Sequence, residues 1–279
     1  MRIGIDARMY GIAQARGIGR YVQELIRQLL ELQGEFVLFL SAEGMKAMPD
    51  HPHVQKILAP FRWYSVAEQL HMPRLIQKAR LDLMHFTHFN VPYFCPVPYV
   101  VTLHDLILLR TNRQRATTLG PLLYTLKYTA WKILLRHTLK NAQRIIVPSQ
   151  AVKDELTVWM PKMTKKTSVI YEGAPELTPP SPSYDKRGLR GSYILYVGSA
   201  YPHKNLERLV QAFEILTTTL PPNPYTLILV GKHDYFYERL KRELQNTPPP
   251  SPPYEGGDKG EVIFMGEVAD NELTQLYRH

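Results

Sequence analysis

Short apolar runs alternate with longer amphipathic segments along the chain. Apolar runs of four to six residues are typical of buried strands, and apolar residues three and four positions apart are typical of helices. In the first part we expect strands at residues 2–6, 36–40, 54–58, 81–86, 99–103 and 144–147, and helices at 20–32, 66–79, 119–139 and 150–160. Strands that alternate with helices in this way predict an α/β fold with a parallel sheet.

A proline-rich stretch, LTPPSPSY at residues 177–184, interrupts this alternation. Proline cannot continue a helix or a central strand, so we expect a linker at residues 177–190 between a first domain (1–176) and a second domain (191–279). The second domain repeats the pattern, with strands expected at 193–197, 225–230 and 262–265 and helices at 205–217 and 233–244. The low-complexity stretch at residues 247–260 is expected to be a disordered surface insertion.

Composition places the chain among ordinary globular proteins. It has 279 residues, of which 44% are hydrophobic and 21% are charged. The single cysteine, Cys95, excludes an intramolecular disulfide and a cysteine-cluster metal site. The N-terminus does not have the pattern of a signal peptide, and no apolar run is long enough to cross a bilayer. We therefore expect a cytoplasmic protein that does not span the membrane.

The net charge of +9 is concentrated in one part of the chain. Residues 106–153 contain nine Lys or Arg and no Asp or Glu, interleaved with Tyr124, Tyr128 and Trp131. This block is compatible with a solvated basic face, with contact to an anionic membrane, or with nucleic-acid binding. No recognised nucleic-acid motif accompanies the charge, so we expect no nucleic-acid partner.

Two glycines, Gly17 and Gly19, are expected in a loop that precedes the first helix. Backbone N–H groups at such a helix start can approach a phosphate or a sugar, although a turn that needs glycine explains the same residues. The segment is not the dinucleotide fingerprint, because the third glycine is absent and strand two ends in Ser41 rather than in an acid. A nicotinamide-dependent oxidoreductase is therefore disfavoured.

His104 and Asp105 follow an expected strand, at the edge where open parallel sheets bind their ligands. They are candidate catalytic residues, but adjacent residues of an extended chain point to opposite sides, so they form no simple dyad. A histidine hydrogen-bonded to a loop carbonyl is the alternative. His85 and His88 also follow a strand and have no carboxylate cluster near them, so we expect no metal site. Ser149 is expected to cap a helix rather than to act as a nucleophile.

In the second domain, Gly198, His203 and Lys204 lie between an expected strand and an expected helix. A lysine and free N–H groups at the start of a helix suit a diphosphate. An ordinary surface lysine is the alternative for Lys204. The surrounding turn and helix favour donor binding.

Four segments together resemble the retaining glycosyltransferase family 4, whose members have the GT-B fold. They are GIGRY at 17–21, TLHDL at 102–106, IVPSQAVKDEL at 146–156 and LYVGSAYPHKNLERLVQAF at 195–213. The last segment of the chain, residues 262–279, is similar to a later strand and helix of the family. The resemblance implies two Rossmann-like domains that face each other across a cleft, with the acceptor bound by the first and the nucleotide sugar by the second. It implies no cofactor.

Residue by residue, the resemblance places Gly17 and Gly19 against the donor phosphate and His104 against the transferred sugar, with Asp105 beside it. Lys204 would neutralise the leaving diphosphate, close to Gly198 and His203. The family often has an arginine near that lysine, where this chain has Ser199 and His203. The family's paired glutamates would follow His279, so the resemblance also predicts a chain that is truncated at its C-terminus.

The expected activity is transfer of a hexose, such as mannose, from a nucleotide diphosphate sugar. A lipid-linked or polysaccharide acceptor at the inner face of the cytoplasmic membrane fits the basic block. A non-catalytic remnant that binds sugar or phosphate is the alternative.

Overall fold

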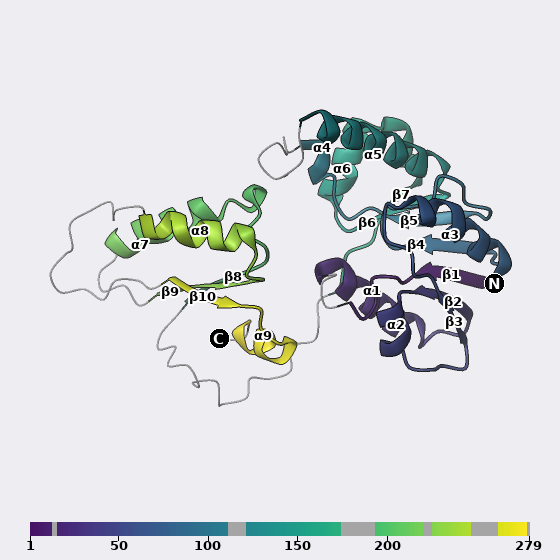
Figure 1. The fold of residues 1–279 in the computed structure, drawn as a ribbon, viewed down its shortest axis with the longest axis horizontal. Coiled ribbons are helices and arrows are strands. Elements are labelled where there is room, and N and C mark those ends of the chain that lie inside the picture. Colours follow the sequence, from purple (N-terminus) through teal and green to yellow (C-terminus); the bar gives the residue numbers. More distant parts are fainter. Residues whose placement is uncertain (13–15, 111–120, 174–192, 220–224, 247–261, 278–279) are drawn as a thin grey trace. The chain divides into compact units, whose positions relative to one another are not determined.

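The structure is a computed structural model that describes residues 1–12, 16–110, 121–173, 193–219, 225–246 and 262–277. These residues form two compact units, the first within residues 1–173 and the second within residues 193–277 (Figure 1). The expected linker at 177–190 and the expected insertion at 247–260 lie outside the described residues.

The first unit contains a seven-stranded parallel sheet with the order β3-β2-β1-β4-β5-β6-β7. Its strands are β1 (Arg2–Asp6), β2 (Glu35–Leu40), β3 (Val54–Leu58), β4 (Leu83–Phe86), β5 (Tyr99–Thr102), β6 (Arg144–Val147) and β7 (Thr167–Val169). Its helices are α1 (Arg16–Leu29), α2 (Ala42–Ala47), α3 (Val66–Lys78), α4 (Ile107–Arg110), α5 (Pro121–Asn141), α6 (Gln150–Trp159) and the 3-10 helix η3 (Pro161–Lys166).

The second unit contains a smaller parallel sheet with the order β10-β9-β8. Its elements are β8 (Tyr193–Val197), the 3-10 helix η4 (Pro202–Lys204), α7 (Leu206–Thr219), β9 (Thr226–Val230), α8 (Tyr235–Asn246), β10 (Val262–Gly266) and α9 (Asp270–Leu276). The predicted α/β class with parallel sheets is confirmed for both units.

Strand β2 shows why the sequence forms a sheet that is covered on both faces. Val37 and Phe39 belong to one apolar cluster, whereas Leu38 and Leu40 belong to another. Side chains alternate between the two faces of a strand, and all four are at most 1% exposed. A continuous apolar run is therefore buried on both sides, as in other parallel sheets with helices on each face.

Two local predictions differ from the structure. Gly17 and Gly19 lie inside α1, which begins at Arg16, and not in a loop ahead of it. The packing of Val22 and Ile26 into the core outweighs the low helix propensity of glycine in the first turns. His85 lies within β4, in agreement with the expected strand at 81–86, so of the two histidines only His88 follows the strand. Strand β7 was not predicted, because its three residues include two polar ones.

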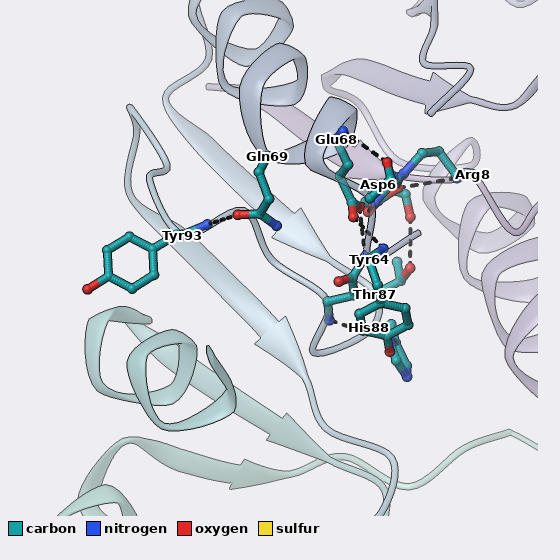
Figure 2. A network of polar contacts seen from close by, with 10 residues as sticks. Asp6, Arg8, Tyr64, Glu68, Gln69, Thr87, His88 and Tyr93 are labelled. Carbon is teal, nitrogen blue, oxygen red and sulfur yellow. Dashed lines mark hydrogen bonds and ion pairs between the residues drawn. The ribbon is translucent and has the colours of Figure 1, made fainter. Parts of the chain in front are cut away.

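The end of β1 is fixed by a buried ion network (Figure 2). The Arg8 guanidinium donates to both carboxylate oxygens of Asp6, at 2.8 and 2.6 Å, and lies 2.6 Å from a Glu68 oxygen. Arg8 and Glu68 are at most 1% exposed. Burial alone would lower the pKa of Arg8, but the carboxylates of Asp6 and Glu68 raise it overall, so the guanidinium stays charged.

This network predicts that Arg8→Met strongly destabilises the first unit. The substitution leaves the buried carboxylates of Asp6 and Glu68 without their countercharge, which costs about 3–5 kcal/mol of unfolding free energy. Urea denaturation followed by circular dichroism measures the change.

The matched control is Arg27→Met, because Arg27 forms its ion pairs with Glu24 and Glu31 on the exposed surface of α1. Such pairs contribute about 0–1 kcal/mol. An equal loss of unfolding free energy in the two variants would contradict the conclusion that the buried network contributes more to stability than the exposed ion pairs.

Candidate functional site

The carboxyl ends of β1, β4 and β5 lie side by side in the first sheet, because these strands are parallel neighbours. Asp6 ends β1, Thr87 and His88 follow β4, and His104 comes two residues after β5. Polar residues that are far apart in the sequence therefore meet at one edge. We call these residues the first-sheet edge.

His104 is held at both ring nitrogens. Nε2 donates to the Thr87 carbonyl oxygen at 2.9 Å, and Nδ1 lies 3.1 Å from a carboxylate oxygen of Glu172. The ring of Tyr21 contacts His104 edge to face, with a centroid distance of 4.8 Å. The Thr87 carbonyl and the Glu172 carboxylate therefore fix the orientation of the ring from two sides.

A second layer of hydrogen bonds connects the elements beneath His104. The Thr102 hydroxyl lies 2.9 Å from His85 Nε2 and 3.2 Å from the Tyr21 hydroxyl. Burial raises the pKa of Tyr21, so its hydroxyl keeps its proton. The contacts join α1, β4 and β5 at the point where His104 leaves the sheet.

His85 and His88 are neutral near pH 7. Burial, together with the nearby charge of His104, lowers the pKa of each to about 4. The backbone N–H of Asn90 donates to His88 Nδ1 at 3.4 Å, and the His88 ring contacts that of Phe89 in a tilted arrangement, with a centroid distance of 4.0 Å. His88 therefore acts as a neutral polar surface at the first-sheet edge.

A narrow pocket opens beside His88. It is lined by Asp6, Met9, Trp63, Thr87, His88 and Asn90. The Thr87 hydroxyl donates to the backbone oxygen of Asp6 at 2.7 Å, which joins the ends of β4 and β1 (Figure 2). No group of three or more metal-ligating side chains occurs among the described residues.

The other predicted residues of the first unit have different surroundings. Gly17 is exposed in the first turn of α1, and a Cβ built on it would meet nothing within 4 Å. Gly19 is buried in the same helix, two residues before Tyr21. Asp105 points to backbone, since its carboxylate accepts from the N–H of Ile107 at 3.0 Å at the start of α4. The structure thus brings the GIGRY helix to His104 through Tyr21.

In the second unit, Gly198 and η4 lie at the carboxyl end of β8. Gly198 has φ 155°, and its carbonyl accepts from the Tyr237 hydroxyl at 2.9 Å. His203 and Lys204 are exposed on η4, where the His203 ring stacks against Tyr201. Asn205 then takes a left-handed conformation, φ 54°, directly before α7. Gly198 therefore has a structural role, and the two basic residues are exposed at this edge.

Sequence reasoning missed several residues of the first-sheet edge. Glu172 approaches His104 from 68 positions away, and no motif connects the two. Trp63 and Asn90 lie in irregular segments whose course the apolar pattern does not determine. Thr102 and Tyr21 lie inside the TLHDL and GIGRY segments. The sequence therefore identified both segments as important, but it did not predict the contact between these two side chains.

Comparisons with known proteins agree with this architecture. The family model described as Glycosyltransferase Family 4 matches residues 15–175, more than half of the chain. A search of curated proteins finds no match. Among solved structures, HepE of Anabaena in complex with UDP-glucose has a TM-score of 0.64 at 19% identity, over 99% of this chain and 70% of that one.

Two further structures are similar in the same way. A glycosyltransferase from Rickettsia africae has a TM-score of 0.60 at 16% identity, over 99% of this chain and 70% of that one. WaaG, a glycosyltransferase involved in lipopolysaccharide biosynthesis, has a TM-score of 0.58 at 14% identity, over 99% of this chain and 72% of that one. At these identities the likeness shows the fold, which is the GT-B type.

The neutral histidines predict that the protein loses stability in acid. Because the pKa values of His85 and His88 fall from 6.5 to about 4 on folding, the unfolded chain binds more protons between those values. The unfolding free energy should therefore fall as the pH drops from 6.5 towards 4, by about 1.4 kcal/mol per pH unit for each histidine.

Urea denaturation at several pH values measures this slope. His85→Gln should remove about half of the histidine contribution, whereas the exposed His53→Gln should leave the slope unchanged. The same slope in His85→Gln as in the wild type would show that His85 is not the source.

Proposed function

Because the chain belongs to Glycosyltransferase Family 4, we propose that it transfers a hexose from a nucleoside-diphosphate sugar to a lipid-linked or polysaccharide acceptor, with retention of anomeric configuration. The observation that carries the proposal is the fixed position of His104 at the first-sheet edge of a chain that matches this family. The fold similarity to HepE in complex with UDP-glucose supports a nucleotide sugar as donor.

In this proposal the first unit supplies His104 at the transferred sugar. Its ring is held by Thr87 and Glu172, with Tyr21 against it, so it needs no reorganisation when the sugar binds. Gly17 is exposed in the first turn of α1, where N–H groups favour a phosphate. Asp105 holds the backbone of α4, and we assign it no step.

The second unit supplies the cations for the diphosphate. Lys204 and His203 are exposed at the carboxyl end of β8, and no ion pair of Lys204 is found among the described residues. Negative charge on the diphosphate grows as the glycosidic bond breaks, and a nearby ammonium stabilises it. The proposed transfer requires no cofactor or metal ion from the protein.

Donor binding and transfer test this proposal with a panel of UDP- and GDP-sugars. Lys204→Gln should weaken donor binding by roughly 10- to 100-fold, because it removes a charge-assisted hydrogen bond of about 1.5–3 kcal/mol. Titration calorimetry measures binding, and release of UDP or GDP measures turnover.

Lys241→Gln, on the exposed face of α8, is the control and should bind the donor like the wild type. Donor binding without any turnover would favour a non-catalytic protein that binds nucleotide sugars. Absence of binding to every donor in the panel would contradict the proposal.

Helix α5 supports contact with an anionic membrane surface. Leu122, Leu126 and Ile133 are 85%, 67% and 58% exposed, and Lys127 and Lys140 are exposed on the same helix. Apolar side chains beside basic ones fit the boundary between anionic headgroups and acyl chains. No helix among the described residues is long and apolar enough to cross a membrane. We propose that α5 places the protein beside a membrane-bound acceptor.

Vesicle sedimentation tests the membrane proposal. The wild type should bind vesicles of phosphatidylcholine with phosphatidylglycerol, and the double variant Lys127→Gln, Lys140→Gln should bind roughly 10- to 30-fold more weakly, at about 1 kcal/mol per charge. The control removes two exposed lysines of other helices, Lys46 and Lys78. Equal weakening in both double variants would show that net charge, and not α5, determines binding.

A further inference from the structure

Glu172 comes to His104 from a strand that is not adjacent to β5 in the sheet. In the sheet order, β6 lies between β5 and β7. The backbone N–H of Ile170 donates to the Val147 carbonyl at 2.9 Å, which fixes the chain that leaves β7 against the end of β6. Two residues later, a carboxylate oxygen of Glu172 lies 3.1 Å from His104 Nδ1. The sheet therefore determines where this carboxylate is placed.

The polar interactions of Glu172 are directed at the site and not at the rest of the fold. Among the residues that the structure describes, Glu172 has no hydrogen bond or ion pair other than that with His104. Its side chain is 48% exposed, and ion pairs at exposed positions contribute little to stability. Burial raises the pKa of the Tyr21 hydroxyl, and the nearby Glu172 carboxylate raises it further. Removal of Glu172 should therefore change the surroundings of His104 more than the stability of the first unit.

The ring of His104 has two fixed points with Glu172 and one without it. Nε2 donates to the Thr87 carbonyl at 2.9 Å, and a ring held by hydrogen bonding at this atom alone can tilt about it. The contact at Nδ1 removes this freedom, because two points determine the tilt. A reacting group has to be held within about 0.5 Å and roughly 10–20° of its productive geometry. The second contact is thus of the kind that a group at the transferred sugar needs.

We propose that Glu172 is a positioning residue of the transferase, which acts on the reaction only through the ring of His104. The inference rests on the proposed function. It assigns the effect to the contact at Nδ1 and not to the negative charge of the carboxylate. Such a contact is lost when the side chain is shortened, whereas an uncharged side chain of the same length retains it.

Turnover by the full chain tests this inference with three variants, in the assay of UDP or GDP release. Glu172→Gln keeps the length of the side chain, and its amide both donates and accepts, so it should keep most of the wild-type kcat. Glu172→Asp keeps the charge but is shorter, and it should lose roughly 10-fold in kcat, as should Glu172→Ala. The donor KM should stay within about 2-fold, because the lost interaction belongs to the transition state.

The matched control is Glu31→Ala, which removes another exposed carboxylate of the first unit. Glu31 lies just after α1 and pairs with Arg27, at 3.5 Å. Its loss changes the net charge as Glu172→Ala does, but it leaves the ring of His104 untouched. The control should therefore keep the wild-type kcat, and the melting temperatures of all four variants show whether each one is folded.

Ring dynamics give a second readout that needs no turnover. With 13C-labelled histidine in the full chain, NMR relaxation measures the order parameter of the His104 ring, whose signals are assigned by their loss in His104→Gln. The order parameter should fall in Glu172→Ala and Glu172→Asp and stay at the wild-type value in Glu172→Gln. The exposed His53 is the internal control and should not change in any variant.

Three results would overturn the inference. They are a wild-type kcat in folded Glu172→Ala, a Glu172→Asp variant that is more active than Glu172→Gln, and equal order parameters of the His104 ring in all variants. The second result would assign the effect to charge. Absence of turnover by the wild type with every donor would instead contradict the proposed function, and the order parameters would then still show whether Glu172 positions the ring.

Discussion

The buried guanidinium of Arg8 is the interaction on which the first-sheet edge depends. It neutralises Asp6 at the end of β1 and Glu68 in the first turn of α3, so two carboxylates remain charged in a buried site. Glu68 in turn accepts from the Tyr64 N–H at 2.7 Å (Figure 2). It also accepts from the Asn90 amide at 2.7 Å. A charge buried in this way needs every partner, because an unpaired one costs several kcal/mol. One ion network therefore determines the course of three loops and the charge of the pocket between them.

His104 is likewise held by partners from several segments of the chain, through hydrogen bonds rather than through a buried ion network. Its ring cannot turn without losing the contact to Thr87 or to Glu172, and Thr87 is itself bonded to the end of β1 through its hydroxyl. Below it, Thr102 joins His85 and Tyr21. Because His85 and His88 stay neutral, His104 has no charged histidine against it. The ring of His104 therefore lies against two neutral imidazoles at the first-sheet edge.

Apolar periodicity was sufficient to predict the α/β fold and most strands, because parallel strands buried on both faces have continuous apolar runs, as β2 does. The cap of α6 was also predicted, and Ser149 does accept from the Val152 N–H at 3.3 Å. The sequence could not predict the partner of His104. Glu172 and His104 meet only because β7 lies beside β6, and β7 is too short and polar to be recognised.

The two units differ in the charge that they present, and this difference bears on how the chemistry is divided. At the first-sheet edge the Arg8 cation is paired with Asp6 and Glu68, and His88 is neutral near pH 7. At the end of β8 in the second unit, Lys204 and His203 are exposed beside a glycine turn. Exposed cations suit an anionic ligand such as a diphosphate, whereas the paired charges of the first-sheet edge offer it no unpaired cation. The exposed basic residues at the carboxyl end of β8 are therefore the feature of the second unit that supports the proposed donor site.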